Sequence, residues 1–134
     1  FDVTVIDPRG AFTEARDFGS AKVVADWPDD YFTHHMPDRH TAVVTLTHDT
    51  KLDDAALALC LRSNAFYIGC LGGRKTHRSR LDRLREKGFT EDDIGRIHGP
   101  VGLDIGARTP AEIAISVLAQ MIELYRKEAP DDAF

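Results

Sequence analysis

The sequence has 134 residues, of which 43% are hydrophobic and 29% charged, which predicts one domain with a real core and excludes global disorder. Its net charge of −5 argues against a surface used mainly for nucleic acid, and its longest apolar run, residues 113–119, is too short for a membrane span. No secretory signal opens the chain, and two cysteines are too few for a disulfide framework, so we expect a reducing, cytoplasmic setting.

Three candidate strands lie in the first half of the chain. Residues 3–7 form a β-branched run stopped by Pro8, which predicts a strand buried on both faces. Residues 21–27 are a weaker candidate ended by Pro28, and residues 41–47 are the clearest. The chain begins with Phe1 rather than Met, at or just before the first strand, so we expect a further segment upstream.

A βαβ unit is predicted in the middle of the chain. In residues 51–64 the apolar side chains of Leu52, Ala56, Leu59 and Cys60 fall on one helical face. This helix joins strand 41–47 to a strand at residues 65–71 by short links. Buried apolar strands in such a unit indicate a parallel sheet.

Two further helical segments follow the last of these strands. Residues 72–88 are strongly basic, with a narrow apolar seam at Leu81 and Leu84 and a helix stop at Gly88. Thr90 is a candidate N-cap for a short helical turn.

The final helix has the strongest start signal. Thr109 as N-cap, Pro110 at the first position and Glu112 two residues later predict a capping box. Residues 113–125 are apolar at nearly every position, so this helix is expected to be buried on most sides.

Four groups of polar or glycine residues follow the strands. In open parallel sheets ligands bind at the carboxyl ends of the strands, where helix N-termini present free amides. The candidate binding residues are Asp7 and Arg9; His48 and Asp49; Gly72, Gly73, Arg74 and Lys75; and Gly102, Asp104, Gly106, Arg108 and Thr109.

The first two groups each allow two interpretations. Asp7 stands where a dinucleotide-binding fold places the acid for ribose hydroxyls, but an Asp-Pro pair also simply ends a strand, and both remain open. His48 with Asp49 could do acid–base work, although we favour Asp49 as the start of the following helix.

The paired glycines before a basic helix predict an amide-lined anion site, to which Arg74 and Lys75 add charge. Residues 74–87 contain seven Lys or Arg against two acids, a local charge of +5 that leaves −10 for the remainder. A solvated basic face explains this as well as phosphate binding does.

The loop before the last helix favours a ligand. Its capping residues explain part of its composition, but a cap requires none of Gly102, Asp104, Gly106 and Arg108. We therefore interpret the loop as a shaped wall of a pocket.

The histidines and cysteines have simpler explanations. His34, His35 and His40 match no standard zinc spacing and are expected in an exposed polar loop, and no metal site is predicted. Cys60 is expected to pack in the core, and Cys70 to be a small buried strand residue rather than a reactive thiol.

Four blocks of sequence carry a family resemblance: VTVIDPR, THDTKLDDAAL, FYIGCLGGRKTHRSRL and GFTEDDIGRIHGPVGLDIGARTPAEIAISVLA. Together they resemble the C-terminal domain of the XdhC/CoxI family over nearly all of residues 2–124. The resemblance implies an α/β fold, a Rossmann-like parallel sheet flanked by helices. Residues 1–134 would be that domain without its first strand and glycine turn. Family members often carry Ala-Leu-Gly-Ser where this chain has Cys-Leu-Gly-Gly, which puts a family-wide role for the Cys70 thiol in doubt.

The resemblance also implies a function. Members of this family look like maturation factors that bind the molybdenum cofactor and help to deliver it to apo-enzymes such as xanthine dehydrogenase and carbon monoxide dehydrogenase. The phosphorylated pterin would offer its phosphate or pyrophosphate to the amides and arginines, and a ribose, if present, to Asp7. Removal of either Arg74 or Arg108 is then expected to weaken retention by about 1–3 kcal/mol.

Two alternatives are kept beside this non-catalytic, cofactor-binding role. An NAD(P)-dependent oxidoreductase would use the same cleft, and a regular GxGxxG turn upstream would favour it. The domain could instead serve mainly in assembly, since a sheet without its central strand has open edges that a homodimer would cover.

Overall fold

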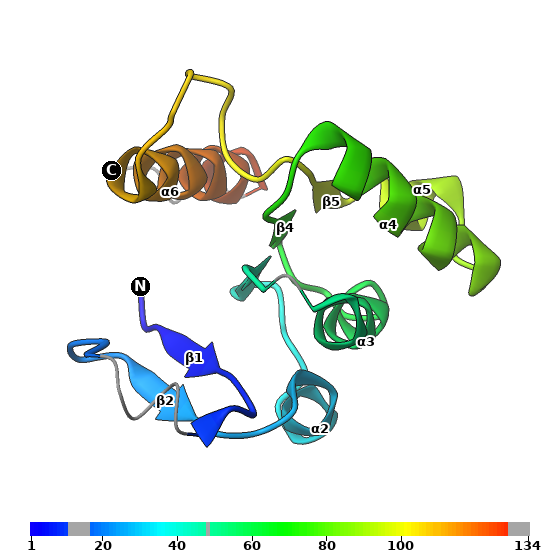
Figure 1. Ribbon diagram of the computed structural model, residues 1–134, viewed down its shortest axis with the longest axis horizontal. Helices are drawn as coiled ribbons and strands as arrows, with labels where there is room; N and C mark the ends of the chain where they lie inside the picture. Colours follow the sequence, from blue (N-terminus) through cyan, green and yellow to red (C-terminus); the bar gives the residue numbers. More distant parts are fainter. Residues whose placement is uncertain (11–16, 48, 129–134) are drawn as a thin grey trace.

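The computed structural model describes residues 1–10, 17–47 and 49–128. The candidate site residue His48 lies outside them. The described elements are β1 (Thr4–Ile6), β2 (Lys22–Val24), α2 (Pro28–His34), β3 (Ala42–Thr45), α3 (Thr50–Cys60), β4 (Tyr67–Cys70), α4 (Arg74–Glu86), α5 (Glu91–Ile94), β5 (Ile97–His98) and α6 (Pro110–Glu128) (Figure 1). Within the described part, no helix combines the length and the hydropathy that a membrane span requires.

All strand pairs are parallel, and they form two sheets. β1 pairs with β2, with Val5 opposite Val23, while β3, β4 and β5 form a second sheet in that order. Figure 1 shows the strands in the spatial order β2, β1, β3, β4, β5. This is the Rossmann order 3-2-1-4-5-6 with the place of strand 1, between β1 and β3, held by no strand of the described residues.

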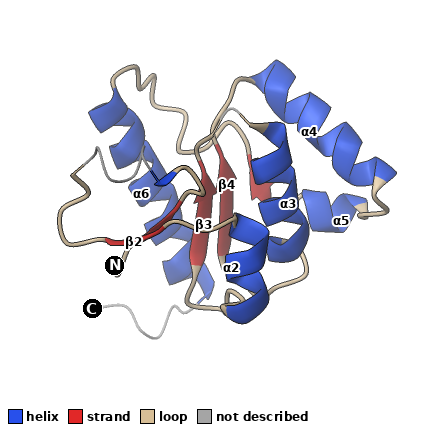
Figure 2. Cartoon of the chain, turned by 60° about the horizontal axis from the view of Figure 1, so that its bottom comes forward, coloured by secondary structure: helices blue, strands red, loops and turns tan. Residues whose placement is uncertain are grey.

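Helices cover both faces of this strand series. α2, α3 and α4 lie on one side, and α6 lies on the other (Figures 1 and 2). Leu57 and Cys60 of α3, Ile68 of β4 and Leu84 of α4 are almost fully buried in the core between the first helical layer and the sheet. Met121 of α6 packs with the aromatic residues at the start of β4 on the opposite face. The predicted α/β class, a parallel sheet flanked by helices, is confirmed.

The local start and stop signals are confirmed as well. Asp49 caps α3 by accepting a hydrogen bond from the Lys51 amide at 2.9 Å. Thr90 forms a capping box with Asp93 at the start of α5. Gly88 follows Lys87, the C-cap of α4, with a φ of 93°, a left-handed conformation that favours glycine.

The prediction that residues 3–7 are buried on both faces is wrong. Thr4 is exposed, Val5 and Ile6 are half-buried, and Val3 remains 55% exposed. β1 also has a paired strand on one side only, so its edge toward β3 is open. The expectation that the last helix is buried on most sides is wrong as well, since Ile115, Leu118 and Ile122 of α6 are 62%, 45% and 47% exposed.

Two elements were not predicted, and the strands are shorter than expected. α2 begins at Pro28 and has Asp29 and Asp30 in its first turn, which are typical of a helix start. The helix was not predicted because the residue before it, Trp27, has no side chain that can cap a helix. His34 accordingly ends a helix instead of lying in a loop, although its side chain is exposed. β5 has only two residues, too few for a periodic pattern.

Candidate functional site

A pocket of about 330 Å³ lies where the carboxyl ends of β4 and β5 meet the start of α6. One wall is the turn after β4, the other is the loop after β5, and the first turns of α6 close it. Its lining consists of Leu71, Gly72, Arg74, Pro100, Val101, Gly102, Leu103, Asp104, Ile105, Gly106, Ala107, Ile113 and Ser116.

The structure divides the predicted site residues between this pocket and other places. Gly72, Arg74, Gly102, Asp104 and Gly106 line the pocket together. Gly73, Lys75, Arg108 and Thr109 are their chain neighbours, but they are not among its lining residues. Asp7, Arg9 and Asp49 belong to the ends of β1 and β3, away from the pocket lining.

The loop wall is fixed to α6 by a polar network. The Gln120 amide oxygen accepts a hydrogen bond from the Gly102 N–H at 3.0 Å, and its amide nitrogen donates to the Gly102 carbonyl at 3.3 Å. The Tyr67 hydroxyl donates to the same Gln120 oxygen, and burial raises the pKa of Tyr67 to about 12, so it remains a neutral donor. The Leu103 amide donates to the Ser116 carbonyl at 3.1 Å. The wall is thus held from β4 and from α6.

The start of α6 satisfies its own amides. The Glu112 carboxylate accepts from the Arg108 and Thr109 amides at 2.9 and 3.0 Å, and the Thr109 hydroxyl accepts from the Glu112 amide. These bonds hold the pKa of Glu112 below its usual range. The predicted capping box is confirmed, and these residues have little capacity left for a ligand.

The turn after β4 is different. Gly72 has a φ of 128°, and Gly73 is the N-cap of α4 without any side chain to accept a hydrogen bond from the first-turn amides. No acid stands in that first turn. Arg74 lines the pocket there, next to the turn.

Asp7 is engaged by its own chain. The Arg9 side chain donates to both Asp7 oxygens, Nε at 2.9 Å and Nη2 at 2.7 Å, and the Arg9 amide also donates to Oδ1. The Arg9 guanidinium therefore holds the pKa of Asp7 below its usual range. This arrangement is that of a strand-ending turn, and a ribose would have to share the carboxylate with Arg9.

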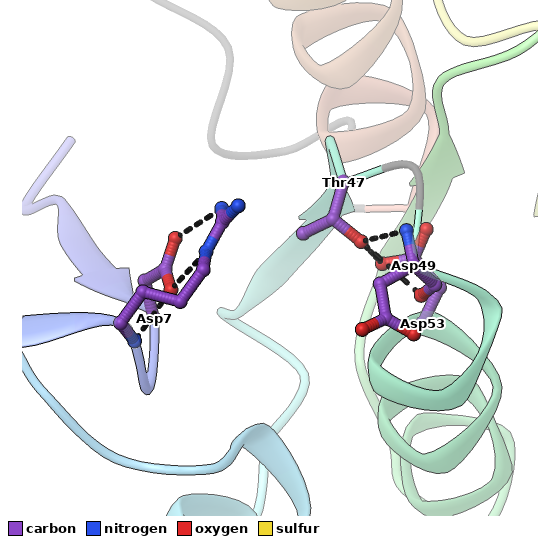
Figure 3. Close-up of polar contacts among 5 residues, drawn as sticks. Asp7, Thr47, Asp49 and Asp53 are labelled. Atoms are coloured by element: carbon purple, nitrogen blue, oxygen red, sulfur yellow. Dashed lines mark hydrogen bonds and ion pairs between the residues drawn. The ribbon is translucent and has the colours of Figure 1, made fainter. Parts of the chain in front are cut away.

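Facing Asp7 across the place without a strand is the start of α3 (Figure 3). The Thr47 hydroxyl donates to the buried Asp53 carboxylate at 2.8 Å and accepts from the Asp49 amide at 3.1 Å. Burial raises the pKa of Asp53, a residue that the sequence did not single out. Asp49 is the N-cap of α3, the structural role that the sequence favoured for it.

The cysteines behave as buried apolar residues. Both have no exposed surface, and burial raises the pKa of Cys60 to about 12 and also raises that of Cys70. The expectation of a packing role for each is confirmed, because a neutral buried thiol is a poor nucleophile.

Several residues that hold the site in place belong to no sequence motif and could not be identified from the sequence. Arg80, Arg96 and Gln120 each bind backbone groups far away in sequence, through hydrogen bonds to Leu71, to the 61–65 segment and to Gly102. Arg80 alone carried a signal. It lies four residues before Leu84, on the face of the basic helix that the apolar seam marks as buried.

Two half-buried histidines beside the pocket make the stability pH-dependent. His98 stacks on the Tyr67 ring, and the His77 ring touches the backbone at Gly99. Burial lowers the pKa of both, and Arg80 lowers that of His77 further. The unfolded chain therefore takes up protons first, so the free energy of unfolding falls as the pH drops below about 6.5.

We expect this fall to be up to about 1.4 kcal/mol per pH unit for each histidine. Urea unfolding at pH 7.5 and 5.5 measures it. His98→Phe, which retains the stacking, is expected to reduce the difference between the two pH values. His34→Gln, at an exposed position, serves as the control for the loss of a histidine, and an equal difference in His98→Phe would contradict the assignment.

Comparison with known proteins gives a consistent result. The family model of the XdhC Rossmann domain matches residues 1–121. The chain is 36% identical over 93 residues to the molybdenum cofactor insertion chaperone PaoD of Escherichia coli (strain K12), covering 68% of this chain and 29% of that protein. It is 31% identical over 130 residues to a protein of Bacillus subtilis (strain 168) whose name describes a probable subunit of xanthine dehydrogenase, covering 96% of this chain and 37% of the relative.

A solved structure agrees with these matches. The crystal structure of a xanthine dehydrogenase from Bacillus halodurans has a TM-score of 0.80 and 31% identity over 99% of this chain and 38% of that one. The chain thus spans between 29% and 38% of the length of these three proteins.

Proposed function

Since the chain belongs to the XdhC family, in which it matches the Rossmann domain, we propose that it binds the molybdenum cofactor as part of a maturation factor for a molybdenum hydroxylase. The name of the relative PaoD, a molybdenum cofactor insertion chaperone, supports this proposal. So do the names of two other similar proteins, which refer to xanthine dehydrogenase. The recipient would be the apo-form of such an enzyme.

The pocket is the observation that carries the proposal. Its volume of about 330 Å³ is within the range of small-molecule sites. Val101, Leu103 and Ile113 offer an apolar surface to a flat pterin ring, while Arg74 and the glycine turn offer charge and amides to a phosphate. Among the described residues no His, Cys, Asp or Glu cluster could hold a metal ion, so the domain would hold the cofactor by its organic part.

The same lining supports a non-catalytic role. Arg74 and Asp104 are the ionisable side chains among the lining residues, and a guanidinium is not a general base. Neither forms a pair of nucleophile and base with a neighbour in the pocket. The bound cofactor would supply redox chemistry in the recipient enzyme, and the role proposed for this protein is to bind, orient and shield it.

The test is to purify the full-length parent anaerobically and to identify any pterin that co-purifies. Arg74→Ala is expected to reduce retention about 10-fold, the cost of one charge-assisted contact. Arg108→Ala is expected to have a smaller effect, because Arg108 does not line the pocket. Arg39→Ala, an exposed arginine on another loop, is the matched control.

The outcomes separate the proposals for the ligand. A nicotinamide nucleotide in place of a pterin would support the NAD(P)-dependent oxidoreductase instead. Unchanged pterin content in a folded Arg74→Ala variant would contradict the proposal that the phosphate binds in this pocket.

We further propose that a second copy covers the open edges of β1 and β3. Val3, which precedes β1, is 55% exposed, and Leu46, which follows β3, is 59% exposed, so each of these two strands has a large exposed apolar residue next to it in the chain. Light scattering with and without any segment upstream of Phe1 tests this proposal: the 134-residue chain alone is expected to have the mass of a dimer, and Leu46→Glu is expected to shift it toward the monomer. A monomeric 134-residue chain would rule this arrangement out.

A further inference from the structure

Among the described residues, no side chain accepts a hydrogen bond from the first-turn amides of α4. The N-cap Gly73 has no side chain, and the first helical hydrogen bond runs from the His77 amide to the Gly73 carbonyl at 3.0 Å. The amides of residues 73–76 precede that bond and are therefore open to an external acceptor. This contrasts with α6, whose first amides are occupied by Thr109 and Glu112.

Basic residues stand at the same helix end without an acid. The positive end of a helix dipole disfavours cations, so Arg74 and Lys75 in the first turn of α4 are unfavourable for the helix by itself. No ion pair forms on either of them in the described part, whereas Arg83 and Arg85 of the same helix are paired with acids. A local conflict of this kind is typical of a functional site, and a bound anion would resolve it.

A buried arginine determines how the turn is oriented. Arg80 is only 3% exposed, and its Nη2 donates to the Leu71 carbonyl at 3.0 Å. The guanidinium lies directly beneath the turn, with Nη2 3.7 Å from the position of a Cβ on Gly72, and its Nε has no hydrogen-bond partner. It is thus a buried positive charge that the protein's own acceptors only partly satisfy.

The direction of one peptide group follows from this bond. In a planar trans peptide the carbonyl of one residue and the N–H of the next point in opposite directions. Because the Leu71 carbonyl points inward to Arg80, the Gly72 N–H points outward. Leu71 and Gly72 both line the pocket, so this donor faces the side on which a ligand would lie.

We infer that residues 72–75 form a subsite for a phosphate or pyrophosphate group, and that Arg80 is the positioning residue that turns the Gly72 amide toward it. Its donors are the amides of Gly72, Gly73 and the residues after them, with Arg74 and Lys75 supplying charge. The assignment of that phosphate to a pterin rests on the proposed function, but the anion chemistry does not. The ligand's ring would then lie along the apolar loop wall.

The experiment titrates the full-length protein, labelled with ¹⁵N-glycine, with inorganic pyrophosphate. The Gly72 and Gly73 amide signals are expected to shift, while Gly88 and Gly95 at the far end of α4 and on α5 remain in place. Arg80→Met is expected to weaken pyrophosphate binding about 10-fold, and Arg80→Lys, which can still donate to the Leu71 carbonyl, by less than about 3-fold. Arg85→Met removes an equal charge from the exposed side of the same helix and serves as the control.

A second pair of variants avoids any change in the core. Gly73 has a φ of −72°, which proline also adopts, and a Cβ added at this position would stand in open space, so Gly73→Ala and Gly73→Pro are the pair to compare. Only proline removes the amide donor, and only proline is expected to weaken pyrophosphate binding.

The results distinguish the two proposals. Unmoved Gly72 and Gly73 signals at high pyrophosphate, or equal affinities of the two Gly73 variants, would overturn the subsite even if a pterin co-purifies. Pyrophosphate binding with these shifts in a protein that retains no pterin would support the subsite and contradict the proposed function.

Discussion

Replacement of Gly102 by alanine is expected to lower the free energy of unfolding by about 3 kcal/mol and to abolish ligand retention. Gly102 has a φ of 93°, and an added Cβ would stand 2.3 Å from the Ser116 hydroxyl and 3.1 Å from Ser116 Cβ. The loop cannot withdraw, because Gln120 binds both the N–H and the carbonyl of this residue. Strain and overlap therefore act together, and they act on the pocket wall.

Substitutions at two other glycines separate the effect of backbone strain from the effect of steric overlap. Gly106 has a φ of 75° but open space, so Gly106→Ala is expected to cost only the conformational strain, about 1–2 kcal/mol. Gly73→Ala has neither strain nor overlap, but alanine is a poorer N-cap than glycine, so it is expected to cost only about 0.5–1 kcal/mol. Urea unfolding and pterin content measure the series. If Gly102→Ala is no worse than Gly106→Ala, the close contact with Ser116 does not constrain the wall.

The helices could be predicted because their signals are local. Thr109 with Glu112, Asp49 before α3 and Gly88 after α4 satisfy or end the helix within a few residues, and the structure has each of them in that place. The parallel sheet followed from the apolar strands joined by a helix. β5 could not be found in this way, since a two-residue strand is defined by its pairing with β4 and not by its own pattern.

Only the glycine turns of the candidate site could be predicted from the sequence. Their glycines were identified because glycine itself marks a turn, and five of the predicted residues line one pocket. The residues that orient those turns, Arg80 and Gln120, bind backbone groups 9 and 18 positions away, and sequence spacing does not encode such contacts. For Asp7 the sequence allowed two interpretations that it could not separate, a ligand contact and a strand-ending turn. The hydrogen bonds from Arg9 to the Asp7 carboxylate show that the turn is made.

The sequence also contained a charge signal whose meaning depended on the fold. The basic segment 74–87 could be a solvated face or an anion site, and its arginines differ in their contacts. Arg85 forms exposed ion pairs with Asp82 and Glu91, which is the behaviour of a solvated face, whereas Arg83 pairs with the buried Asp54 and ties α4 to α3. Arg74 and Lys75 remain at the uncapped end, where the anion proposal applies.

Replacement of Arg96 by methionine is expected to cost about 3 kcal/mol or more in unfolding free energy. The Arg96 guanidinium donates to the carbonyls of Leu61, Ser63 and Ala65 at 2.9 to 3.1 Å, and these three residues are buried. Methionine fills a similar volume but leaves the carbonyls without these donors, and lysine offers a point charge in place of a planar fork, so Arg96→Lys is expected to recover only part of the loss.

Arg62 provides the control for this prediction, because it lies on the same segment but is exposed, with its guanidinium 5.2 Å from the centre of the Phe89 ring. Arg62→Met is expected to cost no more than about 1 kcal/mol, as measured by urea unfolding beside Arg96→Met. The segment 61–65 leads into β4, whose other end carries the glycine turn, so Arg96 anchors the strand at the end opposite to the ligand. Arg96→Met should accordingly lower stability while leaving pyrophosphate affinity unchanged in the folded protein. Loss of affinity together with stability would mean that the turn depends on the whole strand and not on Arg80 beneath it.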